Sequence, residues 1–260
     1  MAEQGAQVVA RIGAVLRALS AQSGRPVPTA RLATLAGLTR PTAHRLLTAL
    51  AAEGLVDRDA SRGGWVLGPE TYVLGAVAAD RYDITALAAD AVREVASATG
   101  ESAFLSARRG DETVCLLRQE GSFPLRSHVL YEGIRFPLGV ASAGLAILAM
   151  LPDGEREAYL ARTDLVPAWG PSHGAAAVRA RLTAGRTAGY VVNPGLLVEG
   201  SWGMGAAIFD AAGRPAWALS ATGVESRFGP DRQAEIGRVL LEQAHVVTQR
   251  VTARARRRSG

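Results

Sequence analysis

The chain has 260 residues, of which 48% are hydrophobic, and this is enough for one large domain or two medium ones with buried cores. The sequence contains 29 arginines and no lysine, and its 24 acidic residues leave a net charge of +5. Residues 1–70 carry +3, residues 71–249 carry −3 and residues 250–260 carry +5, so the positive charge is local and a uniformly cationic protein is excluded.

The first predicted element is an amphipathic helix over residues 4–21. Its apolar stripe consists of Val8, Ile12, Val15, Leu16 and Leu19. The chain does not begin with a cationic segment followed by an apolar core, so we expect no signal peptide. The longest apolar run, at residues 139–151, is too short to span a bilayer, and we therefore expect a cytoplasmic protein with no membrane partner.

Two short helices joined by a glycine-containing turn are predicted next. The first covers residues 29–36, and residues 37–38 make the turn. The first helix is expected to pack through two leucines, Leu32 and Leu35. The second helix begins after Thr39, whose hydroxyl caps the free N–H groups, and ends before Gly54, where the chain needs a positive φ. Its apolar face recurs at helical spacing through Ala43, Leu46, Leu47 and Leu50.

The opposite face of the second helix has no carboxylate from residue 39 to residue 52. A helix that faces a polyanion avoids carboxylates and uses arginine, threonine and histidine as donors. The hairpin over residues 55–67 then resembles a wing, so the segment is predicted to be a winged helix–turn–helix that binds double-stranded DNA. The predicted contacts are Thr39, Arg40, Pro41, Thr42, His44, Arg45 and Thr48 on the helix, and Arg58 and Arg62 on the wing. The alternative is a packing unit of three helices with a solvated arginine face.

A short helix over residues 72–80 is predicted to link this segment to the rest of the chain. We place the DNA-binding domain at residues 1–70, the linker at 71–82 and a second domain at 83–260. In the second domain the patterns predict an antiparallel sheet flanked by helices, which makes the chain an α+β protein. The expected helices cover residues 84–100, 140–151, 155–162, 175–187 and 230–256. The expected strands cover residues 103–107, 113–118, 126–130, 190–192, 202–210 and 215–223.

The single cysteine, Cys115, excludes an internal disulfide. It falls in a predicted strand without a histidine or aspartate pattern around it, so we expect a buried structural thiol rather than a nucleophile.

Three segments resemble the IclR family of bacterial transcriptional regulators, and the resemblance covers nearly the whole chain. They are GLTRPTAHRLLTALAAEGLVDRD from Gly37, FPLGVASAGLAILAML from Phe136, and AGYVVNPGLLVEGSWGMGAAIFDAAGRPAWALSATGVESR from Ala188. The resemblance implies a winged helix–turn–helix joined to a GAF- or PAS-like domain. It also implies a homodimer or dimer of dimers on a palindromic operator, acting as a repressor whose operator affinity is controlled by a small organic effector, often a carboxylate.

Carried over by position, the resemblance places the effector pocket at Ser142, Ala143, Asn193, Gly203, Ser220 and Thr222. The residues support part of this, because Ser142 and Ala143 begin a helix whose N–H groups attract anions. Ser220 and Thr222 share one face of a strand. A hydrogen bond to nearby backbone is the alternative role for each hydroxyl. The family often has an acidic residue in place of Asn193 and a larger one in place of Gly203, which implies a roomier and less charged pocket here.

Two other functions compete with a ligand-controlled regulator. An enzyme is disfavoured because residues 139–144 only approach a nucleophile elbow, with Val140 where glycine is needed, and because the four histidines show no metal spacing. We therefore predict no catalytic residue, metal or cofactor. An architectural DNA-binding protein without a ligand is disfavoured by the length of the second domain, roughly 180 residues.

Overall fold

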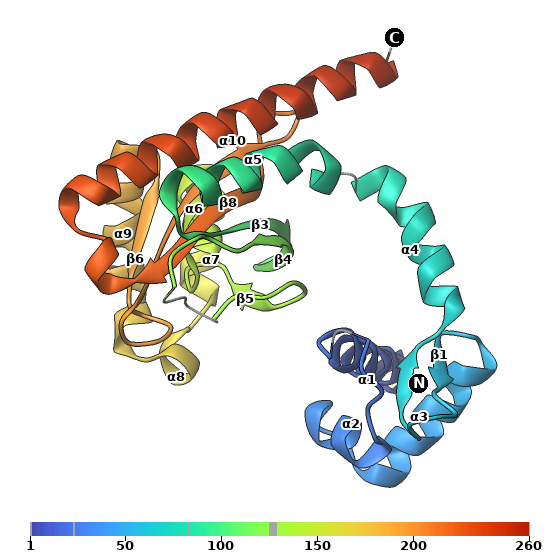
Figure 1. Ribbon diagram of the computed structural model, residues 1–260. Helices are drawn as coiled ribbons and strands as arrows, with labels where there is room; N and C mark the ends of the chain where they lie inside the picture. The colour runs from blue at the N-terminus through green and yellow to red at the C-terminus, as the bar shows by residue number, and fades with distance from the viewer. Residues whose placement is uncertain (1, 23, 83, 125–128, 260) are drawn as a thin grey trace. The chain divides into compact units, whose positions relative to one another are not determined.

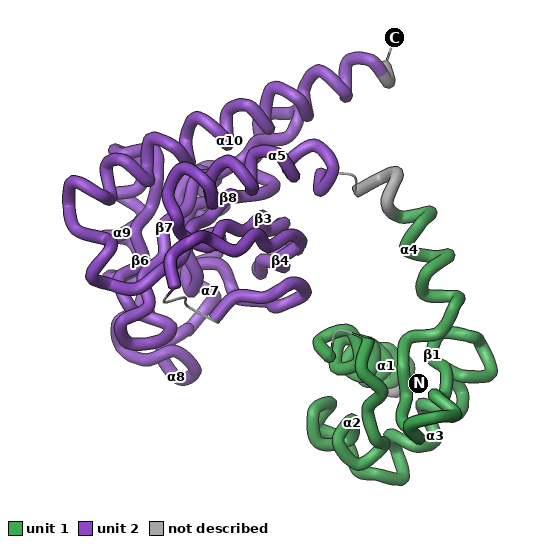
Figure 2. Tube along the Cα trace, viewed as in Figure 1, with its two compact units in different colours: residues 1–83 green, residues 84–260 purple. Residues whose placement is uncertain are grey.

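The computed structural model describes residues 2–22, 24–82, 84–124 and 129–259, and it divides into two compact units, residues 1–83 and 84–260 (Figure 2). The helix that was expected to be a separate linker is counted with the first unit. Within the described parts of the chain, no helix is both long and apolar enough to cross a membrane.

Unit 1 is built from four helices and a two-stranded hairpin (Figure 1). Its elements are α1 (Ala2–Ser20), α2 (Thr29–Leu35), α3 (Arg40–Ala52), β1 (Val56–Arg58), β2 (Trp65–Leu67) and α4 (Pro69–Tyr82). The first three helices and the hairpin enclose one core, formed by Val15, Leu19, Val27, Leu32, Leu47, Leu50, Val56 and Trp65. The predicted helix–turn–helix with a wing is confirmed by this arrangement.

The prediction that Leu35 and Val8 pack in the core of unit 1 is wrong. Leu35 is 40% exposed, and Ala33 is buried in its place. The inward face of α2 is centred between Leu32 and Ala33, which leaves Leu35 at its edge, because successive residues of a helix turn by about 100°. Val8 is 44% exposed because the first turns of α1 extend beyond the core, which begins on this helix at Ile12 and Val15.

Unit 2 contains a six-stranded antiparallel sheet in the order β5-β4-β3-β8-β7-β6. The strands are β3 (Ser102–Arg109), β4 (Glu112–Gln119), β5 (Arg135–Pro137), β6 (Val191–Pro194), β7 (Ser201–Phe209) and β8 (Pro215–Val224). The helices are α5 (Ile84–Thr99), α6 (Ser142–Met150), α7 (Asp153–Arg162), α8 (Val166–Trp169), α9 (Ala175–Ala188) and α10 (Pro230–Ser259), with short 3-10 helices η1 (Pro171–His173) and η2 (Glu225–Arg227). The α+β prediction is confirmed.

Helices cover both faces of this sheet. On one face α5 and α10 lie side by side (Figure 1) and pack on alternate strand residues such as Leu105, Met204 and Leu219. On the other face α6 packs against β7 and β8, with α9 beside it. Because side chains alternate along a strand, Gly203 and Thr222 belong to the α6 face. Because helices cover both faces of the sheet, successive residues of β3, β7 and β8 are buried on either side of it.

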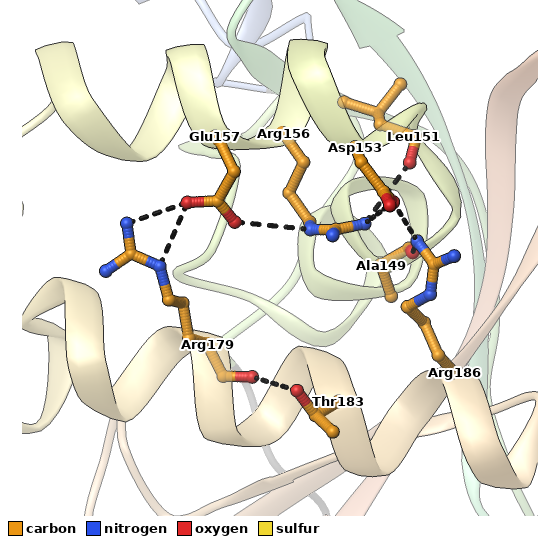
Figure 3. A network of polar contacts seen from close by, with 8 residues as sticks. All are labelled: Ala149, Leu151, Asp153, Arg156, Glu157, Arg179, Thr183 and Arg186. Atoms are coloured by element: carbon orange, nitrogen blue, oxygen red, sulfur yellow. Dashed lines mark hydrogen bonds and ion pairs between the residues drawn. The ribbon is translucent and has the colours of Figure 1, made fainter.

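Ion pairs at the surface hold α7 against α9 (Figure 3). Arg179 donates from Nη2 to Glu157 at 2.8 Å, and Arg186 pairs with Asp153 at 3.1 Å. Arg186 also donates to the backbone carbonyl of Ala149 at 3.2 Å, near the end of α6. Each exposed pair contributes little free energy, but together they fix α6, α7 and α9 relative to one another.

One predicted strand was misplaced. It was expected at residues 126–130, of which 126–128 lie outside the described residues, while Val129 and Leu130 are not in a strand. The strand that pairs with β4 on the side away from β3 is β5, where Phe136 lies opposite Thr113. The helices α8 and η1 were not anticipated, because four- and three-residue helices carry no periodic pattern.

Candidate functional sites

The first candidate site is the outward face of α3. Thr39 caps the helix as predicted: its Oγ1 accepts a hydrogen bond from the backbone N–H of Thr42 at 3.4 Å and lies 2.9 Å from the Thr42 hydroxyl. Pro41 occupies the first turn, where a missing N–H costs little. Ala43, Leu47 and Leu50 are buried against the core. The start of α3 is therefore fixed, and its polar face is oriented by the burial of the other face.

The side chains on that polar face are open to solvent. Exposed residues are Thr39, Arg40, Pro41, His44, Arg45 and Thr48, with Thr42 half-buried. The Thr48 hydroxyl donates to the backbone carbonyl of His44 at 3.0 Å, which leaves its lone pairs as acceptors. Arg45 is exposed on this face and has five N–H donors.

The wing is held by its own acidic residue. Asp59 Oδ1 accepts from the backbone N–H groups of Ser61 at 2.9 Å and Arg62 at 2.8 Å, and from the Ser61 hydroxyl at 2.6 Å. These hydrogen bonds lower the pKa of the Asp59 carboxyl, and the bond from the Ser61 hydroxyl has the largest effect. The Arg58 guanidinium lies 5.8 Å from the ring centre of Trp65, and Arg62 is exposed at the tip. Asp59 thus shapes the turn that carries Arg62, while Asp57 Oδ1 accepts from the backbone N–H of Arg58 at 2.7 Å.

The second candidate site lies in unit 2, on the α6 face of the sheet. Strand register places Asn193 of β6, Gly203 of β7 and Thr222 of β8 in one row, since Asn193 pairs with Gly203 and Gly203 with Thr222. Ser220 lies two residues from Thr222, opposite Gly205, on the same face. The first turn of α6 lies over this row, and Ser142 is its first residue.

Among the residues that the structure describes, three buried polar atoms in this region have no hydrogen-bond partner: Asn193 Oδ1, Ser220 Oγ and Thr222 Oγ1. Asn193 is otherwise anchored, because its Nδ2 donates to the backbone carbonyl of Val140 at 2.8 Å. The alternative role considered for the hydroxyls, a bond to nearby backbone, does not apply to Ser220 and Thr222. A buried polar atom without a partner costs about 1–3 kcal/mol, so three in one place require a reason.

A small cavity opens beside these atoms. Its described lining is uncharged and consists of Val129, Leu130, Ala141, Ser142, Asn193, Leu197, Ser201, Trp202, Gly203 and Thr222. The cavity volume is about 20 Å³, room for roughly one water molecule. The cavity is small in this conformation, and the expectation of a pocket roomier than is usual in the family stays a prediction. A Cβ built on Gly203 would lie 3.0 Å from Ser142 Oγ, so Ser142 takes the space that the glycine leaves.

Two of the six predicted pocket residues do not line this cavity. Ala143 is 4% exposed and packs in the hydrophobic cluster of α6, α7 and α9, because its side chain turns away from Ser142 along the helix. Ser220 lies two residues before Thr222 on the same face of β8 and is fully buried. Sequence reasoning missed Leu197, Ser201 and Trp202, which reach the cavity from the connection between β6 and β7 and the start of β7. The only local signal was the turn at Pro194 and Gly195, which carries no pocket pattern.

Val140, whose carbonyl accepts from Asn193, also interacts through its backbone with a buried histidine. His173 is 1% exposed, and its Nδ1 lies 2.8 Å from the carbonyl oxygen of Trp169. Burial, chiefly, lowers the pKa of His173. From the sequence, His173 was predicted only not to be a metal ligand, because the four histidines are not spaced like ligands of one metal ion.

Burial raises the pKa of the Cys115 thiol to about 12, as suits a structural thiol. Among residues 2–22, 24–82, 84–124 and 129–259, no three His, Cys, Asp or Glu side chains are grouped so that they could hold a metal ion.

Comparison with known proteins covers both units. Residues 8–60 match the IclR helix-turn-helix domain, and residues 76–249 match the bacterial transcriptional regulator IclR C-terminal domain. The chain is similar to the HTH-type transcriptional regulator KipR of Bacillus subtilis, with 28% identity over 85% of this chain and 88% of that protein. It is also similar to the HTH-type transcriptional repressor AllR of Klebsiella pneumoniae, with 27% identity over 95% of this chain and 90% of that protein.

Among solved structures, the fold resembles an IclR homolog from Microbacterium hydrocarbonoxydans complexed with 4-hydroxybenzoate. The TM-score is 0.75 at 24% identity, covering 95% of this chain and 99% of that chain. The domain matches extend over more than half of the sequence. The chain therefore belongs to the IclR family of bacterial transcriptional regulators.

Proposed function

We propose that this regulator is a repressor that binds a palindromic operator as a symmetric homodimer or dimer of dimers, and that a small organic effector bound beside Asn193 and Thr222 changes its operator affinity. We further propose that it has no enzymatic activity and acts in the cytoplasm, where bacterial DNA is found. The relative AllR is named as a repressor, which supports that sign of regulation.

The effector proposal rests on the three buried polar atoms for which the described residues offer no hydrogen-bond partner: Asn193 Oδ1 and Thr222 Oγ1 belong to residues that line the cavity, and Ser220 Oγ lies one residue pair further along β8. Each lowers the stability of the folded chain unless something satisfies it. A ligand with several polar groups would do so, and the N–H groups of the first turn of α6, which have no partner within the helix, add donors for an anionic or carbonyl oxygen. A relative has been solved with 4-hydroxybenzoate, and we propose an organic ligand of comparable size here.

Such a ligand needs more space than about 20 Å³. The lining includes Leu197, within the connection between β6 and β7, and Ser201, the first residue of β7. We propose that this connection moves outward when the effector binds. Ser142 and Thr222 stay in place because α6 and β8 are packed elements.

The DNA half of the proposal needs more than one copy of the chain. One recognition helix reads only a few base pairs, so selectivity requires at least two. Unit 1 also exposes large apolar side chains that a monomer has no use for: Val8 and Val9 on α1, and Tyr72, Val73, Leu74 and Val77 on α4. We propose that these two patches, the α1 patch and the α4 patch, pair the copies.

The two units are connected through α4 rather than by a flexible Gly/Ser tether. A stiff connection would let a change in unit 2 alter the spacing of paired recognition helices. The coupling is limited by the ligand's preference between the two arrangements, typically about 1–3 kcal/mol.

The test uses the full chain with Ser220→Ala and Thr222→Val together. Operator binding is titrated with and without 4-hydroxybenzoate and a panel of related small acids, phenols and amides. We expect the double variant to keep operator binding and lose the response to any compound that affects the wild type. A full response would place the pocket elsewhere, and lost DNA binding without ligand would mean that the two residues only hold the fold.

A matched control is a second double variant with one Ser→Ala and one Thr→Val substitution at buried positions outside the cavity. Ser106 and Thr113 are also buried in the sheet, 4% and 3% exposed, and neither lines the cavity. Ser106→Ala with Thr113→Val is expected to respond as the wild type does.

A further inference from the structure

We infer that the effector carries a neutral hydrogen-bond donor, a hydroxyl or an N–H group, and that Asn193 selects for it. This rests on the proposed effector function, and it goes further by naming the chemical group that must face β6. Simple carboxylates without a hydroxyl or N–H group are excluded as full agonists by the same reasoning.

The orientation of the Asn193 amide follows from its partner. A backbone carbonyl only accepts hydrogen bonds, so the group 2.8 Å from the Val140 oxygen must be Nδ2. The reverse orientation would place two acceptors against each other. Oδ1 is therefore the other polar atom of this lining side chain, and it is buried with no partner among the residues that the structure describes.

An amide oxygen in this position accepts a hydrogen bond and cannot donate one. A carboxylate or ether oxygen placed there would leave Oδ1 unsatisfied and add acceptor–acceptor repulsion. A cationic donor is disfavoured because the described lining holds no carboxylate to balance it. The remaining choice is a neutral O–H or N–H.

Thr222 does not impose the same selection. Its hydroxyl rotates and serves as donor or acceptor, so it adapts to either kind of ligand group. Asn193 cannot adapt, because turning its amide breaks the bond to Val140. The amide at position 193 thus sets the chemical class of the ligand, while the hydroxyl at 222 contributes affinity.

The test compares ligands that differ only in the donor. Dissociation constants of the full-length wild type are measured by calorimetry or thermal shift for matched sets, beginning with 4-hydroxybenzoate, 4-fluorobenzoate and benzoate, and with 4-methylphenol and 4-fluorotoluene as a neutral set. Fluorine is close in size to a hydroxyl but does not donate. We expect the hydroxyl member to bind on the order of 10–100-fold more tightly, because the fluorine analogue leaves a buried acceptor unpaired.

Two variants locate the selection. Asn193→Ala should bring the hydroxyl-to-fluorine ratio close to one, and Thr222→Val should weaken both members alike and keep the ratio. If Asn193→Ala fails to fold, the ratio of the wild-type dissociation constants for the hydroxyl and fluorine ligands still tests the need for a donor. Equal binding of hydroxyl and fluorine members, or benzoate as the tightest ligand, would overturn the inference and leave the effector function standing. Absence of binding by every member of a wide matched library would contradict the effector function itself, and the inference with it.

Discussion

Arg227 and Glu101 form an ion pair inside unit 2, although 126 residues separate them in the sequence. The Glu101 side chain is 1% exposed and the Arg227 side chain 28%. Arg227 also donates from Nη2 to the backbone carbonyl of Thr99 at 3.2 Å. The pair ties η2, which follows β8, to the start of β3, beside the end of the sheet where Thr222 lies opposite Ser102.

We expect Arg227→Met to lower the free energy of unfolding by about 3 kcal/mol, the low end for breaking a buried pair, because Glu101 is left buried without its partner while Arg227 is partly exposed. Urea denaturation followed by tryptophan fluorescence measures this. Arg238→Met is the control, since Arg238 and Glu242 are 62% and 55% exposed, and it should cost less than about 0.5 kcal/mol. Equal effects of the two exchanges would show that burial of the carboxylate does not matter.

Arg45→Ala should weaken binding to an operator selected from random DNA by about 1–3 kcal/mol and change binding to unrelated DNA little, because a guanidinium in the major groove reads base edges. Arg62→Ala, on the wing, should weaken both sequences alike and reduce the salt slope by about 0.9, the signature of one lost phosphate contact. Fluorescence anisotropy at several salt concentrations gives both quantities. A uniform loss for Arg45→Ala would make it a phosphate contact as well.

Val77→Glu should shift the chain toward monomers at micromolar concentration, because it places a charge in the α4 patch, where Val77 is 74% exposed in the single chain. Sedimentation velocity reports the change. Val198→Glu makes the same exchange at a valine that is 52% exposed in unit 2 and should leave the assembly unchanged. A wild type that sediments as a monomer and binds a half-site one-to-one would contradict the symmetric oligomer.

His173 should make stability depend on pH in one direction. Burial, with the nearby Arg181 guanidinium adding to it, holds the pKa of the folded-state imidazole below its ordinary 6.5, so below that pH the unfolded chain binds more protons. The stability due to neutral His173 is therefore complete above pH 6.5 and is lost as the pH falls through 6.5 toward the folded-state pKa.

Thermal unfolding between pH 7.5 and 5 tests this. His173→Asn, whose Nδ2 can replace Nδ1–H toward the Trp169 carbonyl, should lose less stability on acidification than the wild type. His245→Asn, at an exposed position on α10, should retain the wild-type slope. Parallel slopes for all three proteins would show that His173 does not contribute to the acid sensitivity.

Much of the DNA-reading surface was predictable from the residues in order. The cap at Thr39, the apolar positions Ala43, Leu47 and Leu50, and the positive φ of Gly54 all lie within about one helix length, and local rules fix them. Errors arose where a partner decides which side of a helix is inward. Leu35 was placed in the core because the sequence of α2 does not say where α3 crosses it.

The sequence by itself determined the helix–turn–helix, the wing, the α+β class and the family, because these depend on residues that are neighbours along the chain. Only the tertiary structure decided the cavity. Asn193, Gly203 and Thr222 meet because β6, β7 and β8 pair in one register, and a one-residue slip of any of these strands would move its residue to the opposite face. Likewise, Ser142 fills the space beside Gly203 because α6 lies close to β7, a contact across about 60 residues that no local pattern encodes.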